Sequence, residues 1–550
     1  MQTISQMLAE VRRRTPGATA VAYRGGRITF AEIDGAARRA ARGLSELGIG
    51  HGDRVALWLP NSPAYLVLWL GAARLGAVTV AVNTRFRALE VADIVQRSGA
   101  KALALWPGFR GIAFLDILGE IDRSALERLE TLVIYEEAEG DGAAGGTGTA
   151  AATPPALPAS LARCRRVSFP DLLERPPLDE DRAAPGDRAN MFTTSGTTRA
   201  PKFVVHSHAS VTTHALAVAR ELGYAADPVG GVLGALPLCG VFGFCQTTAA
   251  LAAGSTLALT SAFDAAEAVR LVDEHRVRCL NVTDDMVLAM FDATRREVAL
   301  PTVEACGYAA FTAKPDELLT RAKARGLTLV GLYGMSEVQA FFARQPLDAA
   351  PERRLLGGGI PVDPAGRVRV RDPESGSLLA AGEAGEIEIA GPSLMREYYG
   401  DPGATRETIS EDGFVRSGDL GHLTDDGGFV YLARMGDAMR LGGFLVSPAE
   451  IEGQLNEHPA VRGAQVVEVD TERGPRPVAF VVSDPNGGFD EEALREHCGQ
   501  SLARFKVPDR IYAVDEFPTT MSANGTKIRR TDLRRMAEER FASSPVPPGV

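Results

Sequence analysis

The sequence lacks the features that mark secreted, membrane-spanning and zinc-binding proteins. Its six cysteines are scattered, with no CxxC or Cys/His ligand spacing, so we expect reduced thiols in a cytoplasmic protein. No run of about 18 residues is free of charged and polar side chains, which predicts no membrane span. The N-terminal segment MQTISQMLAEVRRRTPG has no apolar signal core.

An excess of basic residues is also missing. The 550 residues include 59 Lys and Arg against 70 Asp and Glu, for a formal net charge of −11. This balance argues against a general nucleic-acid or anionic-membrane surface, while one local basic pocket stays compatible with it. The composition, 45% hydrophobic and 23% charged, is typical of a soluble globular protein. The length predicts at least two domains, and the absence of a fixed-period repeat argues against a solenoid.

The order of sequence patterns predicts an α/β fold. Helical and strand patterns alternate in residues 28–110 and again after residue 191, which is typical of largely parallel sheets. From about residue 357 short strand-like pieces follow, such as GRVRVRD and GEIEIAG. An alternating α+β pattern then continues to about residue 535.

We therefore expect two domains. Residues 1–435 would form a large N-terminal domain of α/β sheets with a small β-rich subdomain, and residues 436–550 a small, mobile α+β C-terminal domain that acts as a lid. Residues 138–160, AEGDGAAGGTGTAAATPPALPAS, are of low complexity and cannot bury enough apolar area to offset the cost of ordering. This segment is predicted to be a mobile surface loop.

The stretch MFTTSGTTRAPKFVVHSH, residues 191–208, sets hydroxyls and a glycine between two apolar runs. A strand that runs into such a turn offers a triphosphate many short donors and little steric bulk, and Lys202 adds a point charge. The turn comprises Thr194, Ser195, Gly196, Thr197 and Thr198. It has neither the GxxxxGK(S/T) pattern of Walker NTPases nor the GxSxG pattern of serine hydrolases. Taken alone, an ordinary loop explains it equally well.

Further polar features follow along the chain. They are YGMSE at residues 333–337, SGDLG with Asp419, then Arg434, and finally GTKIRR with Lys527. Each has a simpler explanation by itself, as a core residue, a solvated carboxylate, a surface ion pair or a tail charge. Their occurrence together, in this order and at these separations, points to one shared site.

As a set, these segments resemble the AMP-forming adenylate-ligase superfamily, which includes acyl- and aryl-CoA synthetases, peptide-synthetase adenylation domains and luciferases. The resemblance runs from about residue 15 to residue 535. TTSGTTRAPK resembles the phosphate loop of the family, GLYGMSE its adenine-and-phosphate motif and RSGDLG its ribose-binding motif. ARMGDAMRLGGFLVSPAEIE resembles the hinge segment, and SANGTKIRR the segment with the catalytic lysine.

The resemblance implies that ATP binds at these motifs. Tyr333 would stack on adenine beside Gly334, and Ser336 would hydrogen-bond a phosphate. Asp419 would accept hydrogen bonds from both ribose hydroxyls, and Arg434 would lie near the ribose and the phosphate. Thr194 to Thr198 and Lys202 would hold the remaining phosphates.

It also implies how the reaction is catalysed. Glu337 would hold Mg²⁺, a hard cation suited to one carboxylate plus phosphate oxygens, and Lys527 would reach the attacking oxygen and the α-phosphate. No protein nucleophile takes part. A rotation of the C-terminal domain about Gly436 would then admit CoA, since glycine permits large changes in φ and ψ. Gly442 and Gly443 fit the path of the thiol, and a plain turn explains them equally well.

Two residues of the phosphate-loop segment depart from the family pattern, TSGTTGxPKG. Arg199 replaces a glycine and could point outward into solvent or clamp the pyrophosphate; the first is preferred. Phe203 also replaces a glycine, and we expect it to pack at the start of a strand.

Other departures fall where the acid would bind. Gly240 stands where relatives commonly carry a histidine, and Phe311 would narrow the pocket. The segment NVTDDMVLAMF is explained by Thr283 capping a helix with Asp284 and Asp285 in its first turn, which we prefer. The alternative is that an aspartate of this pair, with Asp284 the candidate, faces an amino or hydroxyl group of the substrate.

The leading hypothesis is an ATP- and Mg²⁺-dependent acid–CoA ligase acting on an aryl, cyclic or medium-chain acid. A second keeps adenylation but changes the partners: a carrier-protein thiol or an amine as acceptor, or nitrite with an aromatic amine, as in the diazotases that resemble this family. A third is a catalytically inactive nucleotide-binding or scaffolding protein, against which Glu337 and Lys527 argue.

Overall fold

The computed structural model describes most of the chain. The described ranges are 1–137, 157–194, 201–224, 230–308, 315–441, 444–471, 474–484, 488–522 and 525–543. Most of the loop predicted at 138–160 lies outside them, and its last residues begin a short 3₁₀-helix, Ala159–Leu161. Several residues singled out from the sequence also lie outside: Ser195, Gly196, Thr197, Thr198, Arg199, Phe311, Gly442 and Gly443.

An eight-stranded sheet forms the N-terminal part of the fold, in the order β19-β9-β8-β4-β3-β5-β6-β7. Its strands are β3 (Arg54–Trp58), β4 (Val78–Ala81), β5 (Ala102–Leu105), β6 (Thr131–Ile134), β7 (Arg165–Ser168), β8 (Arg188–Thr193), β9 (Phe203–Ser207) and β19 (Glu397–Tyr398). The pairs from β7 to β8 are parallel, and only β9 runs antiparallel to its neighbours. The expected parallel sheet is therefore present.

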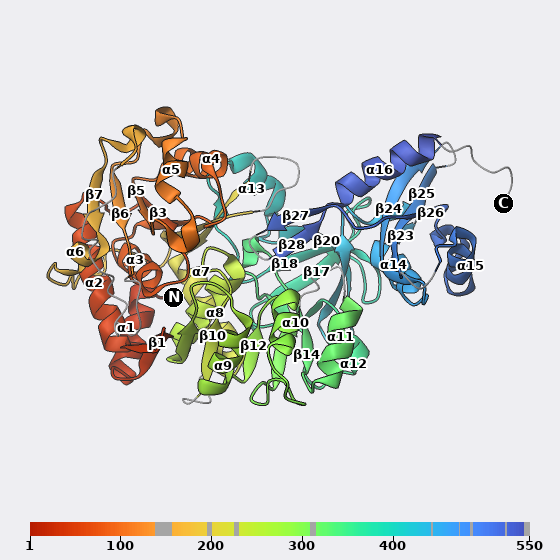
Figure 1. The fold of residues 1–550 in the computed structure, drawn as a ribbon, viewed down its shortest axis with the longest axis horizontal. Helices are drawn as coiled ribbons and strands as arrows, with labels where there is room; N and C mark the ends of the chain where they lie inside the picture. Colours follow the sequence, from red (N-terminus) through yellow and green to blue (C-terminus); the bar gives the residue numbers. More distant parts are fainter. Residues whose placement is uncertain are drawn as a thin grey trace.

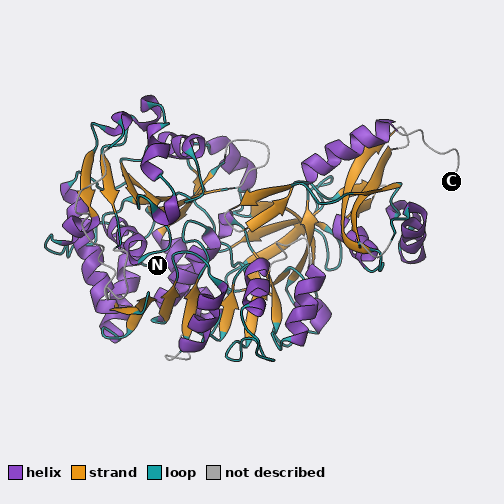
Figure 2. Ribbon diagram, viewed as in Figure 1, coloured by secondary structure: helices purple, strands orange, loops and turns teal. Residues whose placement is uncertain are grey.

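Helices cover this sheet (Figure 2). They include α1 (Ile4–Arg14), α2 (Phe30–Glu46), α3 (Pro63–Arg74), α4 (Ala88–Ser98), α5 (Phe114–Gly119) and α6 (Phe169–Leu173). α2 begins at a capping box, in which Thr29 accepts from the backbone of Glu32 and Glu32 accepts from that of Thr29. Every residue of α3 is buried, as its continuous apolar sequence predicts.

Two further sheets follow. A four-stranded sheet has the order β10-β11-β1-β2 and consists of β1 (Thr19–Tyr23), β2 (Gly26–Thr29), β10 (Gly231–Gly234) and β11 (Thr256–Leu259). Around it run α7 (His208–Glu221), α8 (Val241–Ala253) and α9 (Ala265–Glu274). A nine-stranded sheet has the order β12-β13-β14-β15-β16-β21-β20-β18-β17.

The nine-stranded sheet joins the second α/β series to the β-rich region. Its parallel part is β12 (Cys279–Asn281), β13 (Ala305–Tyr308) and β14 (Leu329–Tyr333), with α10 (Asp284–Asp292) and α11 (Pro315–Ala324) between the strands. Its antiparallel part is β15 (Ala343–Arg344), β16 (Gly358–Pro361), β17 (Arg367–Arg371), β18 (Gly385–Ala390), β20 (Val415–Leu423) and β21 (Phe429–Arg434). The strands expected after residue 357 exist, but they extend this sheet instead of standing apart from it.

The C-terminal region has an α+β core of its own. A three-stranded sheet, β24-β25-β26, contains β24 (Val461–Thr471), β25 (Gly474–Ser483) and β26 (Arg510–Ala513). Two hairpins, β22 (Met439–Leu441) with β23 (Phe444–Val446) and β27 (Thr519–Ser522) with β28 (Gly525–Ile528), and helices α14 (Pro448–Asn456), α15 (Glu491–Ser501) and α16 (Arg530–Ser543) accompany it. In Figure 1 this region lies at the right-hand end of the molecule.

The arrangement confirms the expected fold class, a large N-terminal α/β part followed by a small α+β part (Figure 1). The buried apolar clusters of the C-terminal region begin at Met439 and contain no earlier residue. The domain boundary at Gly436 stays a prediction. It falls between β21, which ends at Arg434, and β22, which starts at Met439.

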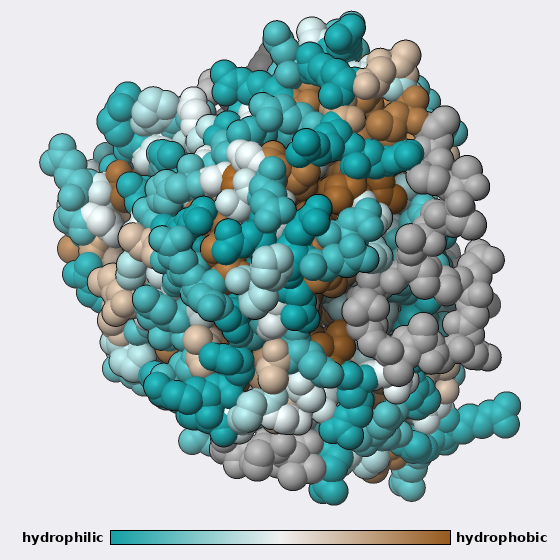
Figure 3. All heavy atoms as spheres, turned by 90° about the vertical axis from the view of Figure 1, so that its left-hand side faces the viewer, coloured by the Kyte–Doolittle hydropathy of each residue, from teal (hydrophilic) through white to brown (hydrophobic). Residues whose placement is uncertain are grey.

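Two further observations concern the cysteines and the helices. All six cysteines are free thiols. No helix among the described residues is long and apolar enough to cross a membrane. The face shown in Figure 3 is mostly hydrophilic.

Candidate functional site

Asp419 is the centre of a cluster that joins three distant segments. It lies on β20 directly opposite Arg434 on β21, and Arg434 Nη1 is 3.0 Å from Asp419 Oδ1. The hydroxyl of Tyr333, at the end of β14, donates to Asp419 Oδ2 over 2.6 Å. The sheet therefore brings together the adenine, ribose and arginine positions inferred from separate motifs.

Burial controls the charge of this cluster. Asp419 is only 3% exposed, and its burial raises the pKa of the carboxyl to about 6, against the opposing effects of Arg434 and the Tyr333 hydroxyl. Burial, followed by the charge of Asp419, raises the pKa of Tyr333 well above its ordinary value. The phenol thus stays protonated and acts as a donor, while Asp419 is ionised only above a pH of about 6.

The ring of Tyr333 is held by the strand that carries Arg434. It packs edge-on against Phe429, with ring centroids 5.0 Å apart, and at a tilt against Tyr431, with centroids 5.9 Å apart. Only 7% of Tyr333 is exposed. The ring position is thus fixed from within the sheet.

The turn after β14 is tight and strained. A Cβ on Gly334 would lie 1.1 Å from the carbonyl oxygen of Ala340, so only glycine fits. Gln339 and Ala340 adopt φ of 61° and 68°, a region that residues with side chains rarely adopt. Between them and Gly334, residues Ser336–Val338 form a single 3₁₀ turn that contains Glu337.

Glu337 is a buried carboxylate that accepts a hydrogen bond from a tyrosine. Its residue is 7% exposed, its backbone oxygen accepts from Met395 N over 2.6 Å, and its Oε1 accepts from the Tyr398 hydroxyl over 2.6 Å. Within the described part of the chain, no lysine, arginine or histidine forms an ion pair with it. Such a group can bind a cation, since a buried carboxylate is otherwise costly.

The donor set fits Mg²⁺ bound together with a nucleotide. No group of three or more His, Cys, Asp or Glu side chains that could hold a metal exists among the described residues. One carboxylate with phosphate oxygens and water supplying the other ligands is the usual arrangement for Mg²⁺. Glu337 can supply the one carboxylate ligand that such a site needs from the protein.

The ends of the segment expected to bind phosphate are joined. Thr194 N donates to Lys202 O over 3.0 Å, and Lys202 N donates to Thr194 Oγ1 over 3.2 Å. The Lys202 ammonium lies 4.5 Å from the ring centroid of Tyr398. The residues between, Ser195 to Ala200, are outside the described ranges.

Arg97, which the sequence did not indicate, holds one end of this segment. From the end of α4, its Nη1 and Nη2 donate to the Pro201 carbonyl over 2.9 and 2.7 Å. Its guanidinium carbon also lies 4.7 Å from the ring centroid of Phe203. Phe203 is 1% exposed at the start of β9, which confirms the packing expected for it.

A buried histidine connects β9 to the turn that contains Glu337. His206 Nε2 lies 2.8 Å from Ser336 O, and burial lowers the pKa of His206 to about 4. The imidazole is therefore neutral near pH 7 and donates to this carbonyl. The sequence showed a histidine here but nothing that assigned it a contact.

The positions predicted for the acid lie on separate elements. Gly240 is the N-cap of α8 and is buried. Asp284 is 2% exposed in the first turn of α10, whereas Asp285 is exposed. Thr283 is the N-cap of α10 and both aspartates lie in its first turn, as predicted, but the Thr283 side chain makes no capping hydrogen bond, so that part of the prediction is wrong.

Lys527 lies in the C-terminal region, and Gly436 lies between β21 and β22, just before it. Lys527 lies on β28 opposite Thr520, in the β27–β28 hairpin. Gly436 follows Met435, whose N–H donates to Gly418 O over 2.8 Å. A Cβ on Gly436 would have no atom within 4 Å, and its φ is not positive.

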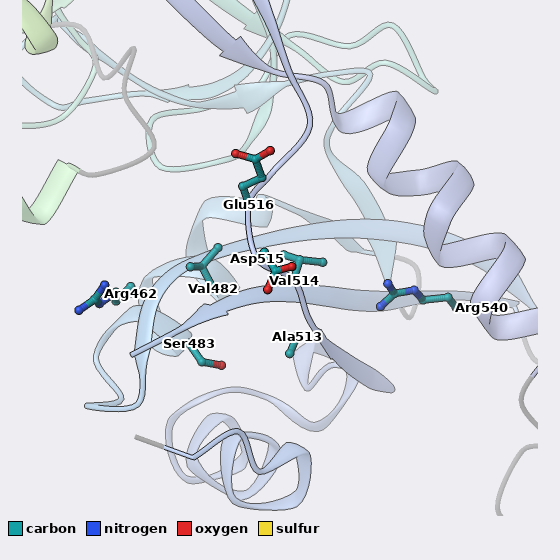
Figure 4. A pocket seen from close by; sticks show the side chains of 8 residues that line it. All are labelled: Arg462, Val482, Ser483, Ala513, Val514, Asp515, Glu516 and Arg540. Atoms are coloured by element: carbon teal, nitrogen blue, oxygen red, sulfur yellow. The ribbon is translucent and has the colours of Figure 1, made fainter. Parts of the chain in front are cut away.

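A pocket elsewhere contains none of the predicted site residues. It has a volume of about 740 Å³ and lies in the C-terminal region, lined in part by Arg462, Asp515, Glu516 and Arg540 (Figure 4). Arg462 is already paired with Asp484 at 3.1 Å. Charges of both signs line it, and nothing about it suits a particular ligand.

Comparisons with known proteins bear on the whole chain. The family model described as "AMP-binding enzyme" matches residues 8–399, and "AMP-binding enzyme C-terminal domain" matches residues 450–524. Among curated proteins, the chain is 31% identical to 4-coumarate–CoA ligase 5 of Oryza sativa subsp. japonica, over 92% of this chain and 89% of that protein. It is also 31% identical to feruloyl-CoA synthase of Amycolatopsis sp, over 95% of this chain and 96% of that protein.

Solved structures share the fold. ATP-bound MatB from Rhodopseudomonas palustris matches with a TM-score of 0.81 at 24% identity, covering 98% of this chain and 100% of that one. A benzoate CoA ligase from Burkholderia xenovorans LB400 matches with a TM-score of 0.76 at 25% identity, covering 97% and 100%.

Proposed function

The chain belongs to the AMP-binding enzyme family, and from this premise we propose that it is an ATP- and Mg²⁺-dependent ligase joining an aryl, cyclic or medium-chain acid to CoA. Membership makes it an AMP-forming ligase. The acid, the metal and the residue roles are the proposal. The observation that carries it is the convergence of Tyr333, Asp419 and Arg434 into one cluster, joined by a hydrogen bond and an ion pair.

The nucleoside would bind at this cluster. A carboxylate has about four acceptor positions on its two oxygens, so Asp419 can keep its bond to Tyr333 and still accept from two ribose hydroxyls. Arg434 is 54% exposed and can turn toward a phosphate while it keeps the carboxylate ionised. The adenine would stack on Tyr333, beside the closely packed Gly334.

The phosphates would lie between the Thr194–Lys202 segment and the turn after β14. Ser336, from that turn, would donate to a phosphate oxygen, and Lys202 would neutralise another. Mg²⁺, when bound, supplies positive charge to the phosphate oxygens as pyrophosphate leaves. Glu337 would hold it with the carboxylate oxygen that Tyr398 leaves free.

Two half-reactions follow from these positions. In the first, an oxygen of the acid attacks the α-phosphorus and the bond to pyrophosphate breaks, with the Lys527 ammonium held against the attacking oxygen and the α-phosphate. In the second, the CoA thiol loses its proton and attacks the acyl carbon, and AMP leaves. A rotation at Gly436 between the two steps would withdraw Lys527 and open the path for CoA.

Two observations make aryl acids the first substrates to test. The two relatives named above carry coumarate and feruloyl in their names. Gly240 has no side chain where relatives commonly carry a histidine, so a ring of the acid would take that place. The second candidate function uses a carrier-protein thiol, an amine or nitrite in place of CoA. The buried Asp284 is the observation that favours a substrate with an amino group.

The first test is acid-dependent exchange of labelled pyrophosphate into ATP across a panel of aryl, cyclic and medium-chain acids. We expect exchange with at least one acid and, on adding CoA, stoichiometric AMP release. Parallel reactions with a carrier protein, an amine, or nitrite plus an aminoaryl acid identify the acceptor. Correctly folded protein that exchanges pyrophosphate with no acid would rule out the proposal.

A further inference from the structure

Tyr398 contacts two of the groups assigned to the nucleotide. Its hydroxyl donates to Glu337 Oε1 over 2.6 Å, and its ring centroid lies 4.5 Å from the Lys202 ammonium. The residue itself is only 4% exposed. One buried phenol therefore touches both the carboxylate expected to hold Mg²⁺ and the cation expected to contact phosphate.

The backbone around Tyr398 is fixed to both neighbouring elements. β19 pairs with β9, where Tyr398 lies opposite Val204, and Tyr399 N donates to Phe203 O over 2.9 Å. On its other side, Met395 N donates to Glu337 O over 2.6 Å. The segment thus joins the start of β9, just beyond Lys202, to the turn that contains Glu337.

The phenol separates two opposite charges. No ion pair between Lys202 and Glu337 exists among the described residues, although both contact Tyr398. In a site shielded from water, a direct pair would be strongly attractive and would occupy both groups. A neutral aromatic ring can hold an ammonium on its face while its hydroxyl donates to a carboxylate.

We propose that Tyr398 is a positioning residue that keeps Glu337 and Lys202 apart, so that the carboxylate remains available to Mg²⁺ and the ammonium to phosphate. The hydroxyl fixes Oε1 and leaves the other oxygen of Glu337 for the metal. The ring holds Lys202 at the end of the phosphate-binding segment. This inference rests on the proposed function, since it takes Mg²⁺–ATP as the ligand.

Two substitutions separate the two contacts of Tyr398. Tyr398→Phe keeps the ring and removes the hydroxyl, whereas Tyr398→Leu removes both. The matched control is Tyr399→Phe, which removes a hydroxyl from the neighbouring, half-buried residue. The guanidinium carbon of Arg188 lies 5.7 Å from the ring centroid of Tyr399, and this contact does not depend on the hydroxyl. Thermal unfolding of each variant shows whether it is folded.

The measurement is nucleotide affinity by titration calorimetry, with AMP in the absence of metal and with a non-hydrolysable ATP analogue at increasing Mg²⁺. For Tyr398→Phe we expect the Mg²⁺ concentration at half-saturation to rise roughly tenfold, as for other partners of metal ligands, with AMP affinity unchanged. Tyr398→Leu should also weaken the analogue at saturating Mg²⁺, because Lys202 is then free to pair with Glu337. Adding Lys202→Met to Tyr398→Leu should lower the Mg²⁺ requirement again.

Two results would overturn the inference. An unchanged Mg²⁺ requirement in Tyr398→Phe would show that the hydroxyl does not prepare Glu337. A parallel loss of AMP and analogue affinity would show that Tyr398 only supports the fold. Failure of the unsubstituted protein to bind any adenine nucleotide would instead overturn the proposed function, and this inference with it.

Discussion

The residues proposed for the nucleotide and those proposed for the acid differ in how they are held. On the nucleotide side, polar side chains bond directly to one another: Tyr333 to Asp419, Asp419 to Arg434, and Tyr398 to Glu337. Of the residues proposed for the acid, Gly240 and Asp284 lie at the starts of two different helices. On the proposed assignments, directly bonded side chains would bind the nucleotide, and single residues from separate elements would bind the acid.

This difference has a physical reason. A fixed network of buried charges is stable only if every member keeps its partner, so a substitution at one member disturbs the others. A pocket lined by single residues from separate elements can change one position at a time. Substitutions of the nucleotide residues should therefore have larger effects on activity than substitutions of the acid residues, and should affect nucleotide binding instead of acid selectivity. The following predictions test this difference.

The largest effect is expected from Lys527→Ala. Loss of the ammonium removes positive charge where it develops on the attacking oxygen and α-phosphate, and should lower pyrophosphate exchange by roughly 100- to 1,000-fold. Calorimetry should show ATP binding close to that of the unsubstituted protein. An unchanged exchange rate would refute the role of the lysine.

Asp419→Asn should weaken nucleoside binding by about 10- to 100-fold, the range for hydrogen bonds to a charged group. The substitution also leaves Arg434 without its partner at 3.0 Å. Adenosine titrations measure the effect without any phosphate. An affinity within twofold of the unsubstituted protein would remove Asp419 from the site.

The same carboxyl should make adenosine binding depend on pH. Its pKa is about 6, so affinity should be constant above that value and fall about tenfold for each pH unit below it. Asp419→Asn should bind with no such slope. The sign for stability is the reverse: because the folded pKa exceeds the ordinary 3.8, this group lowers the free energy of unfolding as pH rises from about 4 to about 6.

Gly240→His should act on the acid side only. We expect kcat/KM for individual acids to change by roughly tenfold, the scale of one pocket contact, with KM for ATP within twofold. Steady-state kinetics across the acid panel give both values. An equal change in both would show that the two sides are not independent.

The smallest effect is expected from Arg97→Ala. Its bonds to Pro201 and its contact with Phe203 lie outside the network itself. Losing them should raise KM for ATP by only about three- to tenfold, without changing selectivity among acids. Arg97→Lys should show part of the same effect, since a lysine cannot form both hydrogen bonds.

The site residues that could be predicted are those that belong to short sequence motifs. Tyr333, Glu337 and Asp419 each follow or lie within a strand and belong to short motifs, so the resemblance could assign them. The fold class was predictable from the alternation of helix and strand patterns along the chain. Roles for these residues remain predictions until the measurements above are made.

The residues that could not be predicted act across long sequence separations. Arg97 reaches Pro201 from the end of α4, His206 reaches Ser336, and Tyr398 reaches Glu337 from a two-residue strand. Nothing in a local pattern distinguishes such a tyrosine or arginine from one in the core or on the surface. The hydroxyl cap expected from Thr283 was wrong because a residue type at an N-cap position does not fix its rotamer.

The open surroundings of Gly436 have a consequence for how this position can be interpreted. The φ angle there is not positive and a methyl group would have no atom within 4 Å, so an alanine would fit in the arrangement described. The proposed rotation of the C-terminal region would give a glycine at this position a use that this orientation does not. A substitution that leaves the first half-reaction untouched and slows the second would therefore report directly on that other orientation.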